Sequence, residues 1–151
     1  MEGKMELVEK FGLKKVVVDE NSSVRSIDRL PDGRWVLRVV LGDSRKATSK
    51  LWAKKIKSVD VSKENGYALE GEFYRTERGK IYATEIILKP REVAVAVIQD
   101  GSWKHPGQRM DVFVALDDGV YTVSGGWESK GDKIKTIYLV YEILNFLNSS
   151  K

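Results

Sequence analysis

Few side chains in this sequence could perform acid–base, nucleophilic or metal chemistry. The chain has no cysteine and a single histidine, His105, which excludes a thiolate metal site, a disulfide framework, a cysteine nucleophile and a histidine pair. The carboxylates Asp117 and Asp118 are explained by the Asp-Gly turn in which they lie, and Glu70 and Glu72 share a strand face. Either pair could bind Mg²⁺ in a small hydrolase, whereas the Gly-Lys-Ser/Thr motif of a phosphate loop is absent. We expect no enzymatic activity, no cofactor and no metal site, and keep a metal-dependent hydrolase only as an alternative.

Aromatic and basic side chains gather at the tip of an expected hairpin. The segments Tyr67–Arg75 and Lys80–Lys89 alternate in polarity, and a short loop with a glycine near its end joins them. Flat rings stack on bases and cations bind phosphates, which is what single-stranded nucleic acid requires. The alternative is that the rings belong to the core and the charges only solubilise an exposed tip. The residues concerned are Tyr74, Arg75, Arg78, Lys80 and Tyr82.

The basic excess of the chain lies in residues 1–65. The sequence has 26 Lys and Arg against 22 Asp and Glu, a formal charge of +4, and the run from Arg45 to Lys57 contains no acid. Trp52, Ile56 and Val59 recur at helical spacing, so we expect an amphipathic helix over about 44–59 with a lysine stripe on another face. The stripe is either a contact for phosphate backbones or a solvated helix face. It consists of Lys46, Lys50, Lys54 and Lys57.

Two further groups of residues are candidates for contacts with nucleic acid. The segment from Gly101 to Arg109 is predicted to be a long loop, and a tryptophan in a polar loop either docks on the core or contacts a partner. Arginines also alternate on one face of the strand expected over Gly33–Gly42. The candidates are Trp103, Lys104 and Arg109 in the loop and Arg34 and Arg38 in the strand.

The elements that must position these residues are mostly strands. We expect an α+β fold in a single domain over residues 1–151, with a mainly antiparallel sheet of about seven to eight strands and two main helices, over about 44–59 and 132–148. A strand–helix order recurs in residues 15–65 and 66–148, so two similar halves are an option. A segment over Met5–Phe11 is expected to be a short helix or irregular. The turns Pro31-Asp32-Gly33 and Asp117-Asp118-Gly119 each join two strands.

The chain has no segment that resembles a targeting signal or a membrane span. Residues 1–10 alternate charged and apolar side chains, unlike a signal peptide. The longest apolar-rich stretch, Ile134–Leu147, is too short to span a bilayer and contains Glu142. We therefore expect a cytoplasmic protein without a membrane partner. The high charged fraction, 32%, and the lack of cysteine are typical of thermophilic proteins.

The expected C-terminal helix is apolar nearly all round. Such a helix must be buried on more than one side, and a second copy of the same helix is the simplest cover, giving a two-fold homodimer. The alternative is a central helix wrapped by a strongly curved sheet. The heptad seam predicted to form the dimer consists of Ile137, Val140, Leu144 and Leu147.

The segment Glu92–Asn148, which is under half of the chain, has a strand, then Trp-Lys-His-Pro-Gly-Gln-Arg, another strand and a final helix. In this pattern it resembles the Positive Cofactor Four/Whirly superfamily of single-stranded DNA-binding proteins. It departs from that pattern by an extra hairpin over Met110–Ser124. The resemblance implies single-stranded DNA binding and dimerisation through the helix. The rival is an OB-fold, for which Ser23–Lys89 supplies four strands, although with a helix between the second and third instead of the third and fourth.

The sequence therefore predicts a non-enzymatic protein that binds nucleic acid, with single-stranded DNA or RNA favoured. The alternative is an oligomeric assembly or adaptor protein that recruits a partner chain through its C-terminal helix. Salt distinguishes the two, because nucleic-acid binding weakens steeply as salt is added and the association of apolar helices does not.

Overall fold

The computed structural model describes residues 3–43, 48–100 and 107–149. Over these residues the α+β class and the antiparallel strand pairing are confirmed, with ten strands in two sheets where about seven to eight were expected. No helix in the described ranges is long and apolar enough to cross a membrane. The elements are α1 (Lys4–Phe11), β1 (Lys14–Lys15), β2 (Val24–Arg29), β3 (Trp35–Asp43), β4 (Lys50–Asp60), β5 (Ala68–Phe73), β6 (Thr76–Arg78), β7 (Ile81–Leu88), β8 (Val93–Gln99), β9 (Gln108–Leu116), β10 (Gly119–Gly126) and α2 (Lys130–Ser149).

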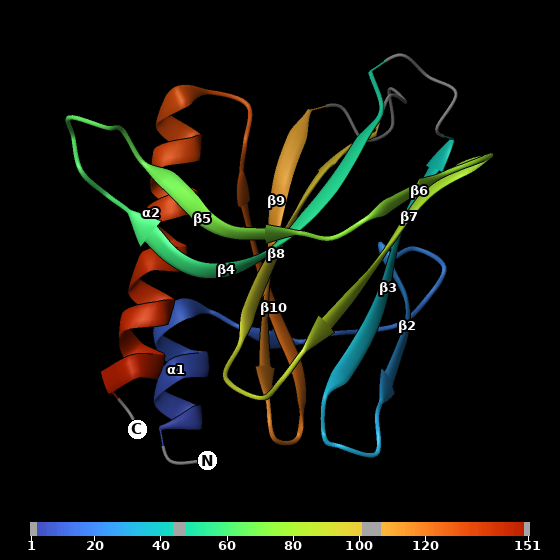
Figure 1. Cartoon of the computed structure of the whole chain (residues 1–151), viewed down its shortest axis with the longest axis horizontal. Helices are drawn as coiled ribbons and strands as arrows, with labels where there is room; N and C mark the ends of the chain where they lie inside the picture. Colours follow the sequence, from blue (N-terminus) through green and yellow to red (C-terminus); the bar gives the residue numbers. More distant parts are fainter. Residues whose placement is uncertain (1–2, 44–47, 101–106, 150–151) are drawn as a thin grey trace.

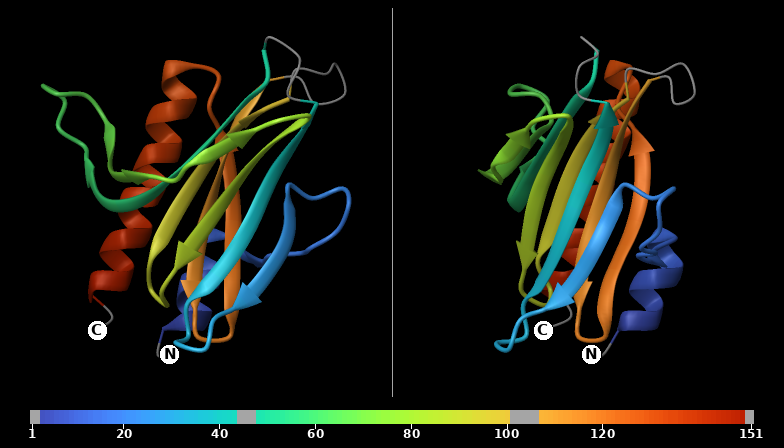
Figure 2. Two further views of the ribbon diagram at one scale, coloured as in Figure 1. Left: turned by 45° about the vertical axis from the view of Figure 1, so that its right-hand side comes forward. Right: turned by 90° about the vertical axis from the view of Figure 1, so that its right-hand side faces the viewer.

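The elements form three layers (Figure 1 and Figure 2). Sheet A has the strand order β1-β10-β9-β8-β4-β5 and is the middle layer, and sheet B has the order β2-β3-β7-β6. One apolar core joins sheet A to α1 and α2, and a second core fills the space between the two sheets. The central strand β8 belongs to both, because Val93, Val95 and Val97 face the helices while Ala94 and Ala96 face sheet B.

The prediction of a helix over 44–59 is wrong. The described residues of this segment lead to strand β4, which pairs with β8 on one side and β5 on the other. The pairing of β4 with β5 shifts register between Ile56 and Ser58, so a β-bulge interrupts the alternation of side chains. Trp52 and Ile56 share a strand face, and the bulge brings Val59 to the same core. A strand with a bulge thus reproduces the spacing that was read as helical.

The chain crosses from sheet A to sheet B between β5 and β6 (Figure 1). The predicted hairpin of 67–75 with 80–89 is therefore only partly correct, because β5 pairs with β4 and only β6 pairs with β7. At the crossing the Tyr74 N–H donates to the Ala53 carbonyl, at 2.9 Å, and the Thr76 hydroxyl to the Leu51 carbonyl, at 3.3 Å. One continuous segment therefore ties the two sheets together.

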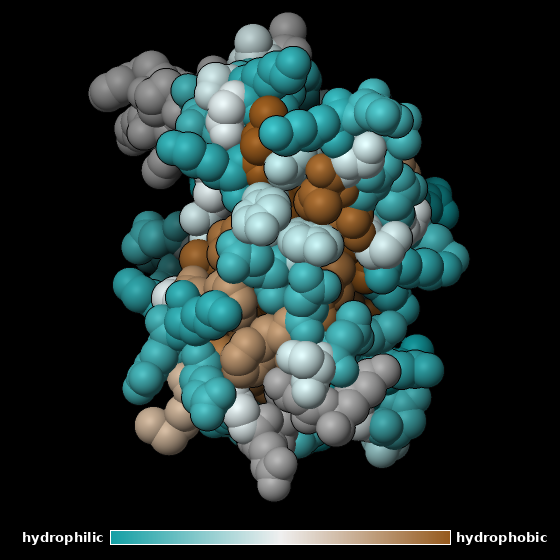
Figure 3. Space-filling view, turned by 90° about the vertical axis from the view of Figure 1, so that its left-hand side faces the viewer, coloured by the Kyte–Doolittle hydropathy of each residue, from teal (hydrophilic) through white to brown (hydrophobic). Residues whose placement is uncertain are grey.

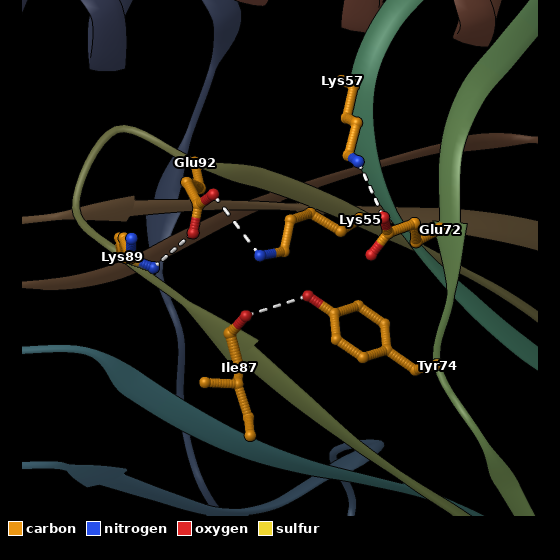
Figure 4. A network of polar contacts seen from close by, with 7 residues as sticks. All are labelled: Lys55, Lys57, Glu72, Tyr74, Ile87, Lys89 and Glu92. Carbon is orange, nitrogen blue, oxygen red and sulfur yellow. Dashed lines mark hydrogen bonds and ion pairs between the residues drawn. The ribbon is translucent and has the colours of Figure 1, made fainter.

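Figure 4 shows one polar contact that ties this crossing to sheet B and two ion pairs beside it, on sheet A. The Tyr74 hydroxyl donates to the Ile87 carbonyl at 2.9 Å, and burial, together with the nearby Glu92 carboxylate, raises the pKa of Tyr74. Lys55 lies 3.4 Å from Glu92. Lys57 lies 2.7 Å from Glu72, and its hydrogen bond lowers the pKa of that carboxyl.

A glycine allows β5 to approach β4 closely beside the bulge. A Cβ placed on Gly71 would lie 1.8 Å from the backbone oxygen of Lys55 and 2.9 Å from its carbonyl carbon. Both distances are far below van der Waals contact. Only a residue without a side chain fits at this position of β5.

The C-terminal helix is confirmed, but its predicted dimer seam faces sheet A in the single chain. Val140 and Leu147 are buried in the core between sheet A and the helices, Leu144 packs against the same core, and Ile137 is also buried. The reason is that α1 and the β4–β5 hairpin supply the extra cover: Phe11 contacts Phe146 edge to face at 6.1 Å, and the hairpin bends toward α2 (Figure 2). This arrangement matches the alternative of a helix covered by a curved sheet, while dimerisation itself stays a prediction.

Candidate functional site

A cleft of about 560 Å³ lies between the β4–β5 hairpin and the beginning of α2. We call it the lysine cleft. Apolar side chains, among them Leu69, Ile134 and Ile137, form part of its wall, and none of its lining residues is acidic. Figure 3 shows apolar atoms exposed between hydrophilic side chains on this side of the molecule. The cationic and aromatic residues of the cleft are Lys54, Lys63, Lys130 and Lys133, with Trp52, Tyr67 and Trp127.

The two tryptophan rings of the cleft contact each other edge to face, and Phe73 extends this cluster outside the cleft. The rings of Trp52 and Trp127 are 6.1 Å apart at an angle of 74°, and those of Trp52 and Phe73 are 5.5 Å apart at 76°. This geometry is favourable for ring pairs, and it leaves ring faces that do not stack on each other. Phe73 is 67% exposed, so the aromatic cluster reaches the surface.

Two of the lysines lie over these rings. The Lys54 ammonium is 4.7 Å from the Phe73 ring centroid and donates to the Leu69 carbonyl at 2.7 Å. The Lys133 ammonium is 5.6 Å from the Trp127 ring centroid. Both contacts are within the range of cation–π attraction, which holds the positive charges next to flat apolar surfaces.

Three of the four lysines have no carboxylate partner among the described residues, so the cleft keeps their positive charge. In the described part of the chain, Lys63, Lys130 and Lys133 form no ion pair with a carboxylate. A concave surface lined by charges of one sign concentrates the field and attracts counter-ions. The cleft is therefore suited to an anionic ligand that also has flat, apolar parts.

Local sequence explains how the two walls are placed. Strand alternation puts Lys50, Trp52 and Lys54 on one face of β4. On the opposite wall, the Thr136 hydroxyl donates to the Gly126 carbonyl at 2.8 Å. A Cβ on the neighbouring Gly125 would lie 2.4 Å from that hydroxyl oxygen, so glycine there lets α2 pack closely on β10. This contact fixes the first turns of the helix, which carry Lys130 and Lys133.

The predicted hairpin-tip residues do not form one surface. Tyr74 is half-buried and hydrogen bonded to Ile87, and Tyr82 packs against the core between the sheets. Arg75 and Lys80 are exposed. The Arg78 guanidinium lies 5.6 Å from the Tyr82 ring centroid. Lys50, Arg78 and Tyr82 do come together, with Trp52, around a small cavity of about 190 Å³.

The remaining predicted residues are distributed over the molecule. Arg34 is paired with Asp32 at 2.7 Å, Arg109 with Asp111 at 3.1 Å, and Lys57 with Glu72. Arg38 lies on β3 between Ser26 of β2 and Glu85 of β7. Of the predicted nucleic-acid contacts that the structure describes, Lys54 is the one that lines the lysine cleft. Three predicted contacts, together with His105, lie outside the described residues: Lys46, Trp103 and Lys104.

Sequence reasoning missed most of the cleft. Lys63, Tyr67, Trp127, Lys130 and Lys133 come from segments that are distant in the chain. One local signal was available, because Lys130 and Lys133 have the i, i+3 spacing that places two side chains on one helix face. They also follow a tryptophan after a pair of glycines.

The carboxylates considered for a hydrolase have other partners. Asp118 accepts a hydrogen bond from the Lys4 ammonium and one from the Tyr121 hydroxyl, the latter at 3.0 Å. Its pKa is lowered, chiefly by the Lys4 hydrogen bond. Glu72 is paired with Lys57. Within the described ranges, no group of three or more His, Cys, Asp or Glu side chains is placed to hold a metal ion.

No family model matches the chain, and no curated protein or solved structure matches it either. The resemblance to single-stranded DNA-binding proteins therefore stays a prediction. The candidate site rests on the geometry of the lysine cleft.

Proposed function

We propose that the protein binds single-stranded nucleic acid and that the lysine cleft is the contact surface. The observation that carries the proposal is the lining of the cleft, in which four lysines and three aromatic rings occur without a carboxylate. Lysines bind the phosphates of any sequence, and aromatic rings stack on any base, with about 1–3 kcal/mol per stacked base. The combination favours a binder with little sequence preference.

The shape of the site favours single strands over duplexes. Trp52 and Trp127 line a cleft instead of standing on a flat surface. The bases of a duplex are stacked and paired, so they do not present their faces to rings in a cleft, whereas unpaired bases do. We expect duplex DNA to bind only weakly, through its phosphates.

Salt-dependent binding of labelled oligonucleotides tests the proposal. The variant with Lys63, Lys130 and Lys133 replaced by Ala should bind single strands more weakly than wild type. The slope of log K against log salt should fall by about 0.7 for each lost phosphate contact, or up to about 2. The matched control replaces the exposed Lys10, Lys14 and Lys89, which lie outside the cleft, by Ala and makes the same change in net charge.

Tryptophan fluorescence supplies a second readout. Stacking on a base should quench Trp52 and Trp127, so Trp127→Phe should reduce the quenching. Trp35→Phe should not, because the Trp35 indole donates to the Leu116 carbonyl at 2.9 Å and has Arg29 over its ring, away from the cleft. Equal affinity and slope in the cleft variant, its control and wild type would refute the proposal, as would an absence of binding to every single strand.

A further inference from the structure

We infer that a bound nucleic-acid strand leaves the lysine cleft across Trp52 and continues into a second cavity formed by Lys50, Arg78 and Tyr82. The inference rests on the proposed function and adds the path of the strand and the length that the protein contacts. We call this cavity the arginine subsite, defined by these three residues together with Ser49, Leu51 and Trp52.

The first argument is continuity. Trp52 lines both the lysine cleft and the arginine subsite, so the two cavities meet at this residue. Lys50 and Lys54 flank Trp52 on the same face of β4. A strand that stacks on Trp52 therefore has a cation on each side of the stacked base for its neighbouring phosphates.

The second argument is charge. None of the residues that line the arginine subsite is acidic, and in the described part of the chain neither Lys50 nor Arg78 is paired with a carboxylate. The Tyr82 ring, 5.6 Å from the Arg78 guanidinium, supports the arginine by cation–π attraction. The subsite thus combines one aromatic ring with two cations that, among the described residues, have no carboxylate partner. The lysine cleft combines the same kinds of side chain in larger numbers.

A second row of rings also leaves the lysine cleft, along α2. The Tyr67 and Tyr138 rings are 6.3 Å apart, and those of Tyr138 and Tyr141 are 5.5 Å apart. This row places Glu142 four residues after Tyr138, on the same helix face. A carboxylate repels phosphate, so the charges favour the path through Lys50 and Arg78.

The geometry gives the length of the contact. Lys50 and Lys54 are four residues apart on strand β4, which is about 13 Å at roughly 3.3 Å per residue. A single nucleic-acid strand with stacked bases advances about 3.4 Å per nucleotide, so this distance corresponds to roughly four nucleotides. An oligonucleotide of about three nucleotides should occupy the lysine cleft alone, and one of about 12 should occupy both sites.

The experiment compares these two lengths in the variant with Lys50→Ala and Arg78→Ala. We expect its affinity for the long oligonucleotide to fall and the salt slope to decrease by about 1.4, or about 0.7 for each phosphate contact. Binding of the short one should equal that of wild type. The matched control is Arg75→Ala with Lys80→Ala, which removes the same two charge types from exposed positions nearby, outside both cavities. Thermal unfolding of each variant confirms that it is folded.

The outcomes separate this inference from the proposed function. If the variant binds both lengths as wild type does, or if Tyr138→Ala removes the gain with length instead, the path is wrong and the lysine cleft remains the site. If wild type binds neither length, both proposals are refuted. Loss of long-strand binding in the Lys50 and Arg78 variant alone supports the inference.

Discussion

Replacing Gly71 by Ala should loosen the wall of the lysine cleft without dismantling the rest of the fold. The added methyl carbon would lie 1.8 Å from the Lys55 oxygen, so β5 would have to move from β4 by about 1.5 Å to approach a normal separation. Overpacking of this kind costs about 1–3 kcal/mol. For a protein of this size that lowers the melting temperature by roughly 2–12 °C.

The matched control for this prediction is Gly79→Ala. Gly79 has ordinary backbone angles, and nothing lies within 4 Å of an added Cβ. The same substitution there should leave the stability unchanged or raise it by about 0.4–1 kcal/mol, since alanine reduces the entropy of the unfolded chain. Urea unfolding measures both variants, and hydrogen exchange should show faster opening in residues 68–73 of Gly71→Ala. Equal stability of both variants and wild type would mean that the close approach of β5 to β4 is not present in solution.

Three further predictions concern hydrogen bonds. Thr136→Val leaves the Gly126 carbonyl without its donor and should lose about 1 kcal/mol of unfolding free energy. Thr136→Ser keeps the hydroxyl and should not. Equal unfolding free energies for the two variants in urea would contradict the role given to this hydroxyl. Tyr74→Phe loses the hydrogen bond to Ile87 and should lower the unfolding free energy by about 0.5–1.5 kcal/mol. Because burial raises the pKa of Tyr74, ultraviolet titration of the wild type should show one tyrosine that does not ionise at the pH at which ordinary tyrosines do. Ionisation of every tyrosine at the ordinary pH in the folded protein would disprove this. The pKa of Asp118 is lowered in the folded state, so its stabilising contact with Lys4 is present above the ordinary aspartate pKa near 4 and is lost as the pH falls through the lowered value. Relative to the intrinsic exchange rate at each pH, the protection of the α1 amides should therefore fall on acidification in wild type, but much less in Asp118→Asn. The same acid dependence of protection in both proteins would contradict the assignment.

Regular elements with strong local signals could be predicted from the sequence. The turns at Pro31-Asp32-Gly33 and Asp117-Asp118-Gly119 do join paired strands, β2 with β3 and β9 with β10, because Gly and Pro determine the backbone locally. The final helix was found from its apolar residues, which are close together in the chain. The helix predicted over 44–59 failed since the bulge near Ile56 changes the alternation by one residue, and no property of a single side chain indicates a bulge.

The sequence predicted which types of residue form the candidate site, but not which individual residues. Lysines and aromatic rings were expected to meet, but the sequence could not show that β5 pairs with β4 instead of with β7. That pairing places Tyr67 opposite the start of α2, and it is decided by the tertiary packing of distant segments. For the same reason the tip residues separated: the crossing at Tyr74 puts this ring between the sheets instead of beside Arg75 and Lys80.

The pairing of β1 with β10 constrains the order in which the chain can fold during synthesis. Lys14 pairs with Thr122, and Phe11 contacts Phe146, so the partners of β1 and α1 are made about 110 and about 135 residues later. At 5–20 residues per second these delays are roughly 5–27 s. A helix of eight residues is not stable by itself, so Leu7 and Phe11 stay exposed to water or to a chaperone throughout that time. Completion of sheet A at β1 is therefore expected to be a late step, and mutations in α1 should accelerate unfolding more than they slow folding.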